Sequence, residues 1–349
     1  MGFSIAGRAI GRDAPPFVIA EMSGNHNQSL ERALAIVDAA AAAGAHALKI
    51  QTYTADSMTL PITDGEFAIR DPKSLWNGRT LYELYQEAAT PYDWHRPIFD
   101  RCREKGVIGF STPFDADAVD FLESLGAPAY KIASFENVDL PLIAKAASTG
   151  KPLIISTGMA TSDEIADAVN AARSAGGRDI VLLKCTSTYP ATPRDTNIRT
   201  IPDLRERFGC EVGLSDHTMG TGVAVASIAL GAVVVEKHFT LSRAEGGVDS
   251  AFSLEPPELA ALVTETRRAW ESLGDVSYGP TASEQKSLQF RRSLYFVADI
   301  RAGTKVDAAH VRAIRPGSGL APKHLGEVIG RTVARDVKRG TPVSWDALA

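Results

Sequence analysis

Short apolar runs alternate with stretches of helical spacing between residues 17 and 273. An apolar run bounded by polar residues is typical of a strand that is buried on both faces of a parallel sheet. About eight such strand–helix units fill this length, which is the length of a (β/α)8 barrel. The expected strands cover residues 17–21, 47–51, 107–111, 129–133, 152–156 and 180–185, together with the runs that begin at residues 211 and 232. We therefore predict an α/β TIM barrel over residues 1–274.

A doubly wound open sheet is the competing architecture, because it is built from the same alternation. Two features favour the barrel. The number of units is right, and polar residues follow every strand. No Gly-x-Gly-x-x-Gly follows the first strand, so the dinucleotide-binding version of the open sheet lacks its usual signature.

The pattern changes after Gly274. Residues 275–290 are polar and show no core pattern, which predicts a linker. Residues 291–349 contain short strand-like pieces separated by turns, at 293–297, 303–306, 315–319, 330–333 and 340–343. About 60 residues suffice for a small domain of its own.

Residues 52–79 interrupt the alternation with a long segment of little periodicity. A segment of this length inside a compact domain is usually functional or disordered, and its aromatic content favours function. We expect the aromatic side chains Trp76, Tyr82 and Tyr85 to pack locally.

Composition excludes several classes of partner. The net charge of −5 gives no support for nucleic-acid binding, which favours a basic surface. The sequence has no apolar run long enough to span a membrane. Three cysteines at unpaired spacings, Cys102, Cys185 and Cys210, fit a reduced, cytoplasmic location and small buried side chains.

Lysines within apolar strands indicate an anion site. Lys49, Lys131 and Lys237 lie in such runs, where an unpaired charge is costly. Polar side chains at barrel strand ends gather on one rim, so Lys49 and Lys131 are expected to bind a phosphate or carboxylate there. The hydroxyls expected beside them belong to Thr112, Ser134, Ser156 and Ser215. The alternative is that these hydroxyls are N-caps of the following helices.

Two histidines follow the last two strands of the barrel. His217 and His238 would lie on one rim, where two imidazoles with oxygen ligands suit a divalent ion that keeps open positions. Each histidine could instead be a hydrogen-bonded structural residue. Glu21, at the end of the first strand, is a candidate acid, base or metal-ordering carboxylate, or else the partner of a lysine.

Ordered motifs along nearly the whole chain resemble the sialic acid synthase family. They lie at residues 20–27 (AEMSGNHN), 48–53 (LKIQTY), 110–115 (FSTPFD), 130–136 (YKIASFE), 156–159 (STGM), 185–190 (CTSTYP), 213–218 (GLSDHT) and 236–240 (EKHFT). Residues 315–320 (RPGSGL) resemble the antifreeze-like (SAF) domain of these enzymes. The opening motif and residues 74–82 (SLWNGRTLY) are most similar to the pseudaminic acid synthase branch.

The resemblance implies a metal-dependent condensation of phosphoenolpyruvate with an N-acylated amino sugar, which releases phosphate and gives a nine-carbon 2-keto acid. For the pseudaminic acid branch the sugar would be 2,4-diacetamido-2,4,6-trideoxy-L-altrose. The divalent ion would be Mn²⁺, Mg²⁺ or Co²⁺, and its ligands His217 and His238. The resemblance also implies a homodimer in which the small domains are exchanged, so that Arg315 reaches the sugar in the barrel of the partner.

The same resemblance assigns the remaining site residues. Phosphoenolpyruvate would be held by Lys49, Thr112, Lys131, Ser134, Ser156, Ser187 and Ser215. The sugar would face Gln51, Glu136, Tyr189, Asp249 and Arg315, and Glu21 would be the acid/base or water-orienting group.

One departure bears on the substrate. The N-acetylneuraminate branch usually has Asn at the position of Ser187 and a different motif where Met22-Ser-Gly stands. Legionaminic or N-acetylneuraminic acid synthesis by the same chemistry is the first alternative. A carbohydrate-binding protein without activity and an aldolase that uses a lysine Schiff base are alternatives of other classes.

Overall fold

Parallel strands close into a barrel in the N-terminal part of the chain. The computed structural model describes residues 2–349. Neighbouring strands follow one another in sequence around the barrel, and β10 pairs with both β9 and β3 to close it. The strands are β3 (Phe17–Glu21), β4 (Ala47–Thr52), β5 (Ile108–Pro113), β6 (Tyr130–Ile132), β7 (Leu153–Ser156), β8 (Ile180–Cys185), β9 (Glu211–Ser215) and β10 (Val234–His238). The predicted TIM barrel is confirmed.

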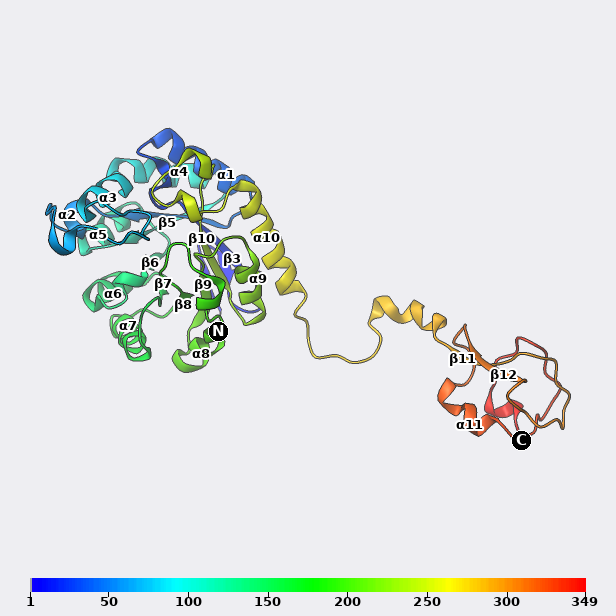
Figure 1. Cartoon of the computed structure of the whole chain (residues 1–349). Coiled ribbons are helices and arrows are strands. Elements are labelled where there is room, and N and C mark those ends of the chain that lie inside the picture. Colours follow the sequence, from blue (N-terminus) through cyan, green and yellow to red (C-terminus); the bar gives the residue numbers. More distant parts are fainter. Residues whose placement is uncertain (1) are drawn as a thin grey trace. The chain divides into compact units, whose positions relative to one another are not determined.

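Helices lie around the outside of this barrel (Figure 1). They are α1 (Leu30–Ala42), α2 (Ala55–Met58), α3 (Leu81–Ala88), α4 (Tyr92–Lys105), α5 (Ala116–Ser124), α6 (Leu140–Ala147), α7 (Ser162–Ser174), α8 (Thr200–Phe208), α9 (Gly222–Ala229) and α10 (Pro256–Glu271). Among residues 2–349, no helix is long and apolar enough to cross a membrane.

Side-chain alternation along the strands separates two apolar layers. Val18 and Ala20 face the surrounding helices, whereas Phe17 and Ile19 point into the barrel. Because side chains alternate with a period of two, Glu21 also points inward, above Ile19. Inward-pointing residues near the starts of the strands are apolar, and they form what we call the lower interior of the barrel. Inward-pointing residues near the carboxyl ends of the strands are polar, and they form the upper interior.

A hairpin of β1 (Phe3–Ile5) and β2 (Arg8–Ile10) precedes the barrel, and the sequence analysis did not predict it. Its residues Ile5 and Ile10 are at most 2 % exposed. They join the interior cluster at the start of the strands, together with Phe17 and Val234. Burying an isoleucine side chain contributes about 1.5–3 kcal/mol, so the hairpin stabilises the end of the barrel opposite the polar one.

Dedicated residues cap the helices that follow the strands. Asp115, Asp139 and Thr161 accept backbone N–H groups at the starts of α5, α6 and α7. The strand-end hydroxyls of Thr112 and Ser156 are therefore not N-caps of these helices, and that interpretation is wrong for them. Their oxygens are left for contacts inside the barrel.

Contacts along the chain divide it into two compact units, Met1–Gly274 and Asp275–Ala349. The second unit begins with a 3-10 helix, η7 (Ala282–Phe290), in which no residue is buried. It continues with the antiparallel pair β11 (Ser293–Phe296) and β12 (Val311–Ile314) and the short helix α11 (Leu325–Val328). Leu294, Phe296 and Val311 lie in an apolar core within this unit.

Several of the strand-like pieces expected in this unit are not strands. Residues 303–306, 330–333 and 340–343 form isolated bridges, such as Lys305 with Thr332 and Tyr295 with Pro342. Residues 315–319 form bends, and β12 lies in a segment that was not expected to be a strand. Turns that contain glycine separate these segments, and each pairing remains an isolated bridge, too short for a regular ladder.

Candidate active site

Two lysines and two glutamates meet inside the barrel near the carboxyl ends of its strands. Lys49 Nζ lies 2.5 Å from Glu21 Oε2 and 3.9 Å from Glu236 Oε2. Lys131 Nζ lies 3.7 Å from Glu236 Oε1, so Glu236 connects the two lysines. We call these four residues the charge quartet. None is more than 6 % exposed, and burial of so many charges is tolerable because each contacts one of opposite sign.

Three of the predicted hydroxyls contact the charge quartet. The pairs are Thr112 with Lys49 (3.0 Å), Ser156 with Lys131 (2.7 Å) and Ser215 with Glu236 (3.3 Å). Each hydroxyl retains one lone pair or proton for a ligand. Lysines and hydroxyls in this arrangement are suited to a phosphate or carboxylate.

The two glutamates of the quartet differ in proton affinity. Burial raises the pKa of Glu21, and the nearby Lys49 only partly opposes the effect. Burial also acts on Glu236, but Lys131 and Lys49 outweigh it and hold the pKa of that carboxyl below its usual range. Carboxyl groups whose environments push their pKa values apart commonly divide acid/base and electrostatic roles. Glu21 is therefore the better candidate for holding or moving a proton.

The two lysines of the quartet also differ in pKa, because they have different carboxylate partners. Burial lowers the pKa of Lys131, which has Glu236 as its nearest carboxylate. Lys49 is also buried, but Glu21 and Glu236 together raise its pKa. Lys49 is thus held in an ion pair, as the alternative interpretation of Glu21 expected, and Lys131 is the less neutralised cation of the two.

A hydrogen-bonded chain connects Glu21 to the histidines. Gln51 Nε2 donates to Glu21 Oε1 (2.9 Å) and to Ser23 Oγ (3.1 Å). Ser23 Oγ donates in turn to Asp249 Oδ2 (2.5 Å), and that oxygen lies 3.8 Å from His238 Nδ1. Of these residues, Ser23 was not a predicted site residue.

The two histidines lie side by side, with ring centroids 5.3 Å apart. His217 Nδ1 is 2.9 Å from the carbonyl oxygen of Thr186. A carbonyl only accepts, so Nδ1 carries a proton and Nε2 is the nitrogen that could ligate a metal once it is deprotonated. Burial, reinforced by the charge of His217 and nearby lysines, holds the pKa of His238 well below its usual value, so this ring is neutral and able to ligate a metal.

The donor set fits a divalent ion with few protein ligands. Among residues 2–349, no three His, Cys, Asp or Glu side chains form a metal-binding group. An ion at His217 and His238 would therefore keep open positions for substrate oxygens, as catalytic sites do. Asp249, beside His238, is placed to orient that ring.

Ser134 and Ser187 converge on a glycine. A Cβ at Gly158 would lie 2.2 Å from Ser187 Oγ and 2.7 Å from Ser134 Oγ. Gly158 N also donates to Ser134 Oγ (3.1 Å). A side chain at this position would force both serines to shift, so the glycine leaves room for hydroxyls from two different strand ends.

Glu136 follows Ser134 in a 3-10 turn, η3 (Ser134–Glu136). Burial raises its pKa to about 7, although Lys131 opposes the shift. Its Oε2 is buried and has no hydrogen-bond partner among the described residues. A buried acceptor of this kind is costly unless a ligand satisfies it.

Aromatic rings cover the histidines. Tyr189 lies 4.5 Å from the His217 ring and 5.3 Å from Phe252, measured between centroids. Trp76 from the long 52–79 segment lies 5.8 Å from Tyr189, and its Nε1 donates to the Val248 carbonyl (2.9 Å). Trp76 thus packs against residues of this site, whereas the sequence analysis expected it to pack locally.

Arg315 belongs to the second unit, where it is exposed and precedes a cis peptide bond to Pro316. The barrel provides all the other predicted site residues. The approach of Arg315 to a barrel therefore stays a prediction.

Sequence reasoning missed two further residues of the site. Glu236 could have been found, because it lies two residues before His238 on one strand and must share its face. Cys185 Sγ lies 3.9 Å from His217 Nδ1, and this contact lowers the pKa of the thiol to about 7 despite burial. Lys237 points the other way, toward the helices, where it pairs with Asp216 (2.8 Å).

Comparison with known proteins identifies the family. The model of the NeuB family matches residues 36–278, and that of the SAF domain matches residues 291–349. The chain belongs to the NeuB family. The predicted resemblance to sialic acid synthases is confirmed over both parts of the chain.

Individual relatives of this NeuB-family chain cover nearly its whole length. A pseudaminic acid synthase of Campylobacter jejuni is 44 % identical over 94 % of this chain and 95 % of its own. One from Helicobacter pylori is 41 % identical over 95 % and 97 %. An N,N'-diacetyllegionaminic acid synthase of Campylobacter jejuni is 34 % identical over 92 % and 96 %.

A solved structure agrees with this assignment. The N-acetylneuraminic acid synthetase of Leptospira borgpetersenii, in complex with citrate, aligns with a TM-score of 0.73 and 33 % identity. The alignment covers 83 % of this chain and 96 % of that one.

Proposed function

We propose that this chain is a pseudaminic acid synthase, which condenses phosphoenolpyruvate with 2,4-diacetamido-2,4,6-trideoxy-L-altrose to give pseudaminic acid and phosphate. The choice of substrate rests on sequence identity, which is higher to pseudaminic acid synthases than to a legionaminic acid synthase. Pseudaminic acid synthases are 41–44 % identical over nearly the whole chain, and the legionaminic acid synthase is 34 % identical. The barrel is the proposed catalytic domain, and the SAF domain is proposed to cover the sugar.

Lys131 and Lys49 are proposed to hold the phosphate and carboxylate of phosphoenolpyruvate, with hydroxyl donors from Thr112 and Ser156. Ser215, which donates to Glu236, is proposed to lie beside the bound phosphoenolpyruvate. Support comes from the buried lysines and the hydroxyls at 2.7–3.0 Å from them. Fixed cations stabilise a leaving phosphate because they need no reorganisation as the charge develops. Ser134 and Ser187 are proposed to contact phosphoenolpyruvate as well, on the side of the site where Gly158 lies.

The carbon–carbon bond forms between C3 of phosphoenolpyruvate and the aldehyde carbon of the sugar. A divalent ion (Mn²⁺, Mg²⁺ or Co²⁺) bound to His217 and His238 would act as a Lewis acid on the aldehyde oxygen. Glu21 is proposed to orient the water that adds at C2, and to accept its proton. Burial raises the pKa of Glu21, which supports a role in which this carboxyl gains and loses a proton during the reaction.

The sugar is proposed to occupy the space bounded by Gln51, Glu136, Tyr189 and Asp249. The unpartnered Oε2 of Glu136 suits a sugar N–H or hydroxyl. We further propose that Arg315 reaches this space from the partner of a domain-swapped homodimer, where its planar fork suits polar recognition. A cytoplasmic location stays a prediction.

Phosphate release from phosphoenolpyruvate tests the substrate. The purified protein with Mn²⁺ is given the L-altrose derivative, the 2,4-diacetamido sugar of legionaminic acid synthesis, or N-acetylmannosamine in separate assays. We expect kcat/KM to be at least about tenfold higher with the first sugar, a difference of about 1.4 kcal/mol in transition-state binding. Equal or higher kcat/KM with either other sugar would overturn the pseudaminic acid assignment.

A further inference from the structure

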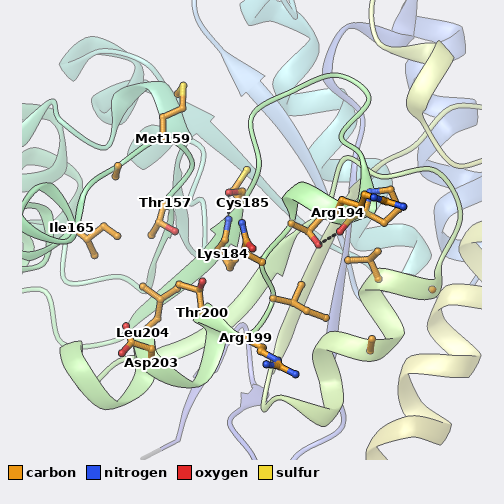
Figure 2. A pocket seen from close by; sticks show the side chains of 18 residues that line it. Thr157, Met159, Ile165, Lys184, Cys185, Arg194, Arg199, Thr200, Asp203 and Leu204 are labelled. Atoms are coloured by element: carbon orange, nitrogen blue, oxygen red, sulfur yellow. Dashed lines mark hydrogen bonds between the residues drawn. The ribbon is translucent and has the colours of Figure 1, made fainter.

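A cavity lies outside the barrel, beside strand β8. Its volume is about 980 Å³, and residues of α7, α8 and α9 line it together with the segment that precedes α8 (Figure 2). Lys184 of β8 is part of its wall. Leu183 belongs to the interior cluster and Leu182 to the outer one, so alternation places Lys184 on the outer face. The cavity therefore lies on the outer side of β8, and it adjoins the proposed substrate site at Cys185 and Thr157, which also line it.

The charge of this cavity is positive and poorly compensated. Lys184, Arg194 and Arg199 line it, and Asp203 is its one lining carboxylate. Asp203 also lies 3.4 Å from Arg207. Arg207 does not line the cavity, and it neutralises part of the charge of Asp203. Within residues 2–349, Lys184 has no carboxylate within 4.0 Å, and its Nζ donates only to the carbonyl of Cys185 (2.7 Å).

Lys184 is half-buried, and burial lowers its pKa. A lysine is seldom buried without an acidic partner, since removal of its charge from water is costly. An anion in the cavity would supply that partner. Arg194 and Arg199 add two planar forks of the kind that bind phosphate in bidentate fashion.

The remaining walls are apolar. Ile165, Leu204 and Val223 contribute side chains from α7, α8 and α9, and threonine hydroxyls such as Thr200 lie between the apolar and basic parts. Ligand sites in proteins typically have volumes of about 300–1,000 Å³, with apolar walls and a few converging polar groups. This cavity has a volume in that range and a lining that is partly apolar and partly basic.

We propose that this cavity is a second binding site, which takes a nucleotide-sized organic phosphate. The phosphate contacts Lys184, Arg194 and Arg199, and the organic part lies against the apolar wall. The cavity is many times larger than inorganic phosphate. An organic group attached to the phosphate would therefore contact the apolar wall and contribute to the affinity.

The wall of the cavity is connected to the proposed substrate site. Thr186 Oγ1 donates to the carbonyl of Asp195 (3.3 Å), in the same segment as Arg194. The carbonyl of Thr186 accepts from His217 Nδ1, and Ser187 follows directly. A ligand that orders this segment would therefore shift the apparent KM for phosphoenolpyruvate. This effect rests on the proposed function, whereas binding does not.

Isothermal titration calorimetry on the full-length protein tests binding. The probes are adenosine 5′-monophosphate, cytidine 5′-monophosphate and inorganic phosphate. We expect a nucleotide to bind more tightly than phosphate, and Lys184→Met and Arg199→Gln to weaken it at least about tenfold. Lys184→Arg keeps the charge and is expected to keep binding. Arg267→Gln removes an exposed arginine of α10 and should change nothing.

The Lys131→Met variant separates the two sites. It damages the proposed phosphoenolpyruvate site, and nucleotide binding should persist in it. Loss of nucleotide binding in this folded variant would place the probe inside the barrel and overturn the proposal. So would absence of binding at millimolar nucleotide, or equal affinity in the wild type and in Lys184→Met.

The coupling has its own readout. Adenosine 5′-monophosphate should change the KM for phosphoenolpyruvate in the wild type and leave it unchanged in Arg199→Gln. If the protein proves to use other substrates, calorimetry still tests the cavity. A nucleotide that binds without changing the KM of an active enzyme would overturn the coupling.

Discussion

Replacement of Lys131 by methionine should damage both stability and phosphoenolpyruvate binding, and a second substitution should separate the two effects. Methionine keeps the length of the side chain and removes its charge. Glu236 would then keep only Lys49, at 3.9 Å, as a cationic partner among the described residues. Its carboxylate is 6 % exposed, so water cannot replace the lost contact.

The magnitude of the stability loss follows from this geometry. Removal of one partner from a buried ion pair costs about 3–5 kcal/mol. We expect about 3 kcal/mol for Lys131→Met, since Lys49 and the hydroxyl of Ser215 remain near Glu236. The double variant Lys131→Met/Glu236→Gln removes both charges. Its free energy of unfolding should return to within about 1 kcal/mol of the wild type, because replacement of a whole buried pair is often nearly neutral.

Substrate binding should not recover in parallel. A charge-assisted contact contributes about 1.5–3 kcal/mol, so the KM for phosphoenolpyruvate should rise roughly tenfold to more than a hundredfold in both variants. The KM for the sugar should change far less. Urea unfolding and steady-state phosphate release measure the two quantities.

Two results would refute this reasoning. If the double variant regained the wild-type KM for phosphoenolpyruvate, Lys131 would serve only to neutralise Glu236. If Lys131→Met raised the KM values of both substrates equally, the lysine would be structural. Ser156→Ala is a matched control, since it removes the 2.7 Å hydroxyl contact of Lys131 but no charge.

Three further predictions concern the metal, the sugar and the dimer. His217→Ala or His238→Ala should abolish turnover and sharply weaken Mn²⁺ binding in calorimetry, because few protein ligands remain; full activity of either variant after chelator treatment would contradict the assignment. The carboxyl of Glu136, with its pKa raised to about 7, ionises in the protein only above that pH. The KM for the sugar should therefore fall as pH rises through about 7, and Glu136→Gln should remove this inflection; an unchanged profile would exclude the contact. Inactive Arg315→Ala and Lys131→Met chains should recover part of the activity in mixed dimers, and no recovery in verified heterodimers would mean that Arg315 does not act on its partner's barrel.

The barrel was predictable because its signal is local and repeated. Each strand is an apolar run followed by a polar end, as at residues 17–21 and 152–156. Eight such strand–helix units are the number that closes into a barrel. The N-terminal hairpin was not predictable in this way. Its strands have three residues each, and their burial depends on Ile5 and Ile10 reaching an interior formed by distant segments.

The predicted site residues within the barrel gather in its upper interior because strand-end position determines where a side chain points. Lys49, Lys131 and Glu21 follow from this rule. Their pairing does not, since which carboxylate neutralises which lysine depends on distances across the barrel. Trp76 was beyond prediction for a related reason. Its segment has no periodicity, and its contact with Tyr189 depends on how a long loop folds back.

The second unit was harder to predict. Its strands are short, and most of its pairings are single bridges such as Lys305 with Thr332. Such a pattern resembles any sequence rich in turns, and it was the motif at residues 315–320 that indicated the domain. The position of Arg315 relative to a barrel depends on a partner chain.

The most direct test of the account is a crystal structure of the protein with phosphoenolpyruvate and Mn²⁺. The account predicts phosphoenolpyruvate inside the upper barrel, in contact with Lys131 and Ser156, and the ion bound to nitrogen atoms of His217 and His238. Phosphoenolpyruvate bound away from Lys131, or Mn²⁺ bound without either histidine, would contradict it.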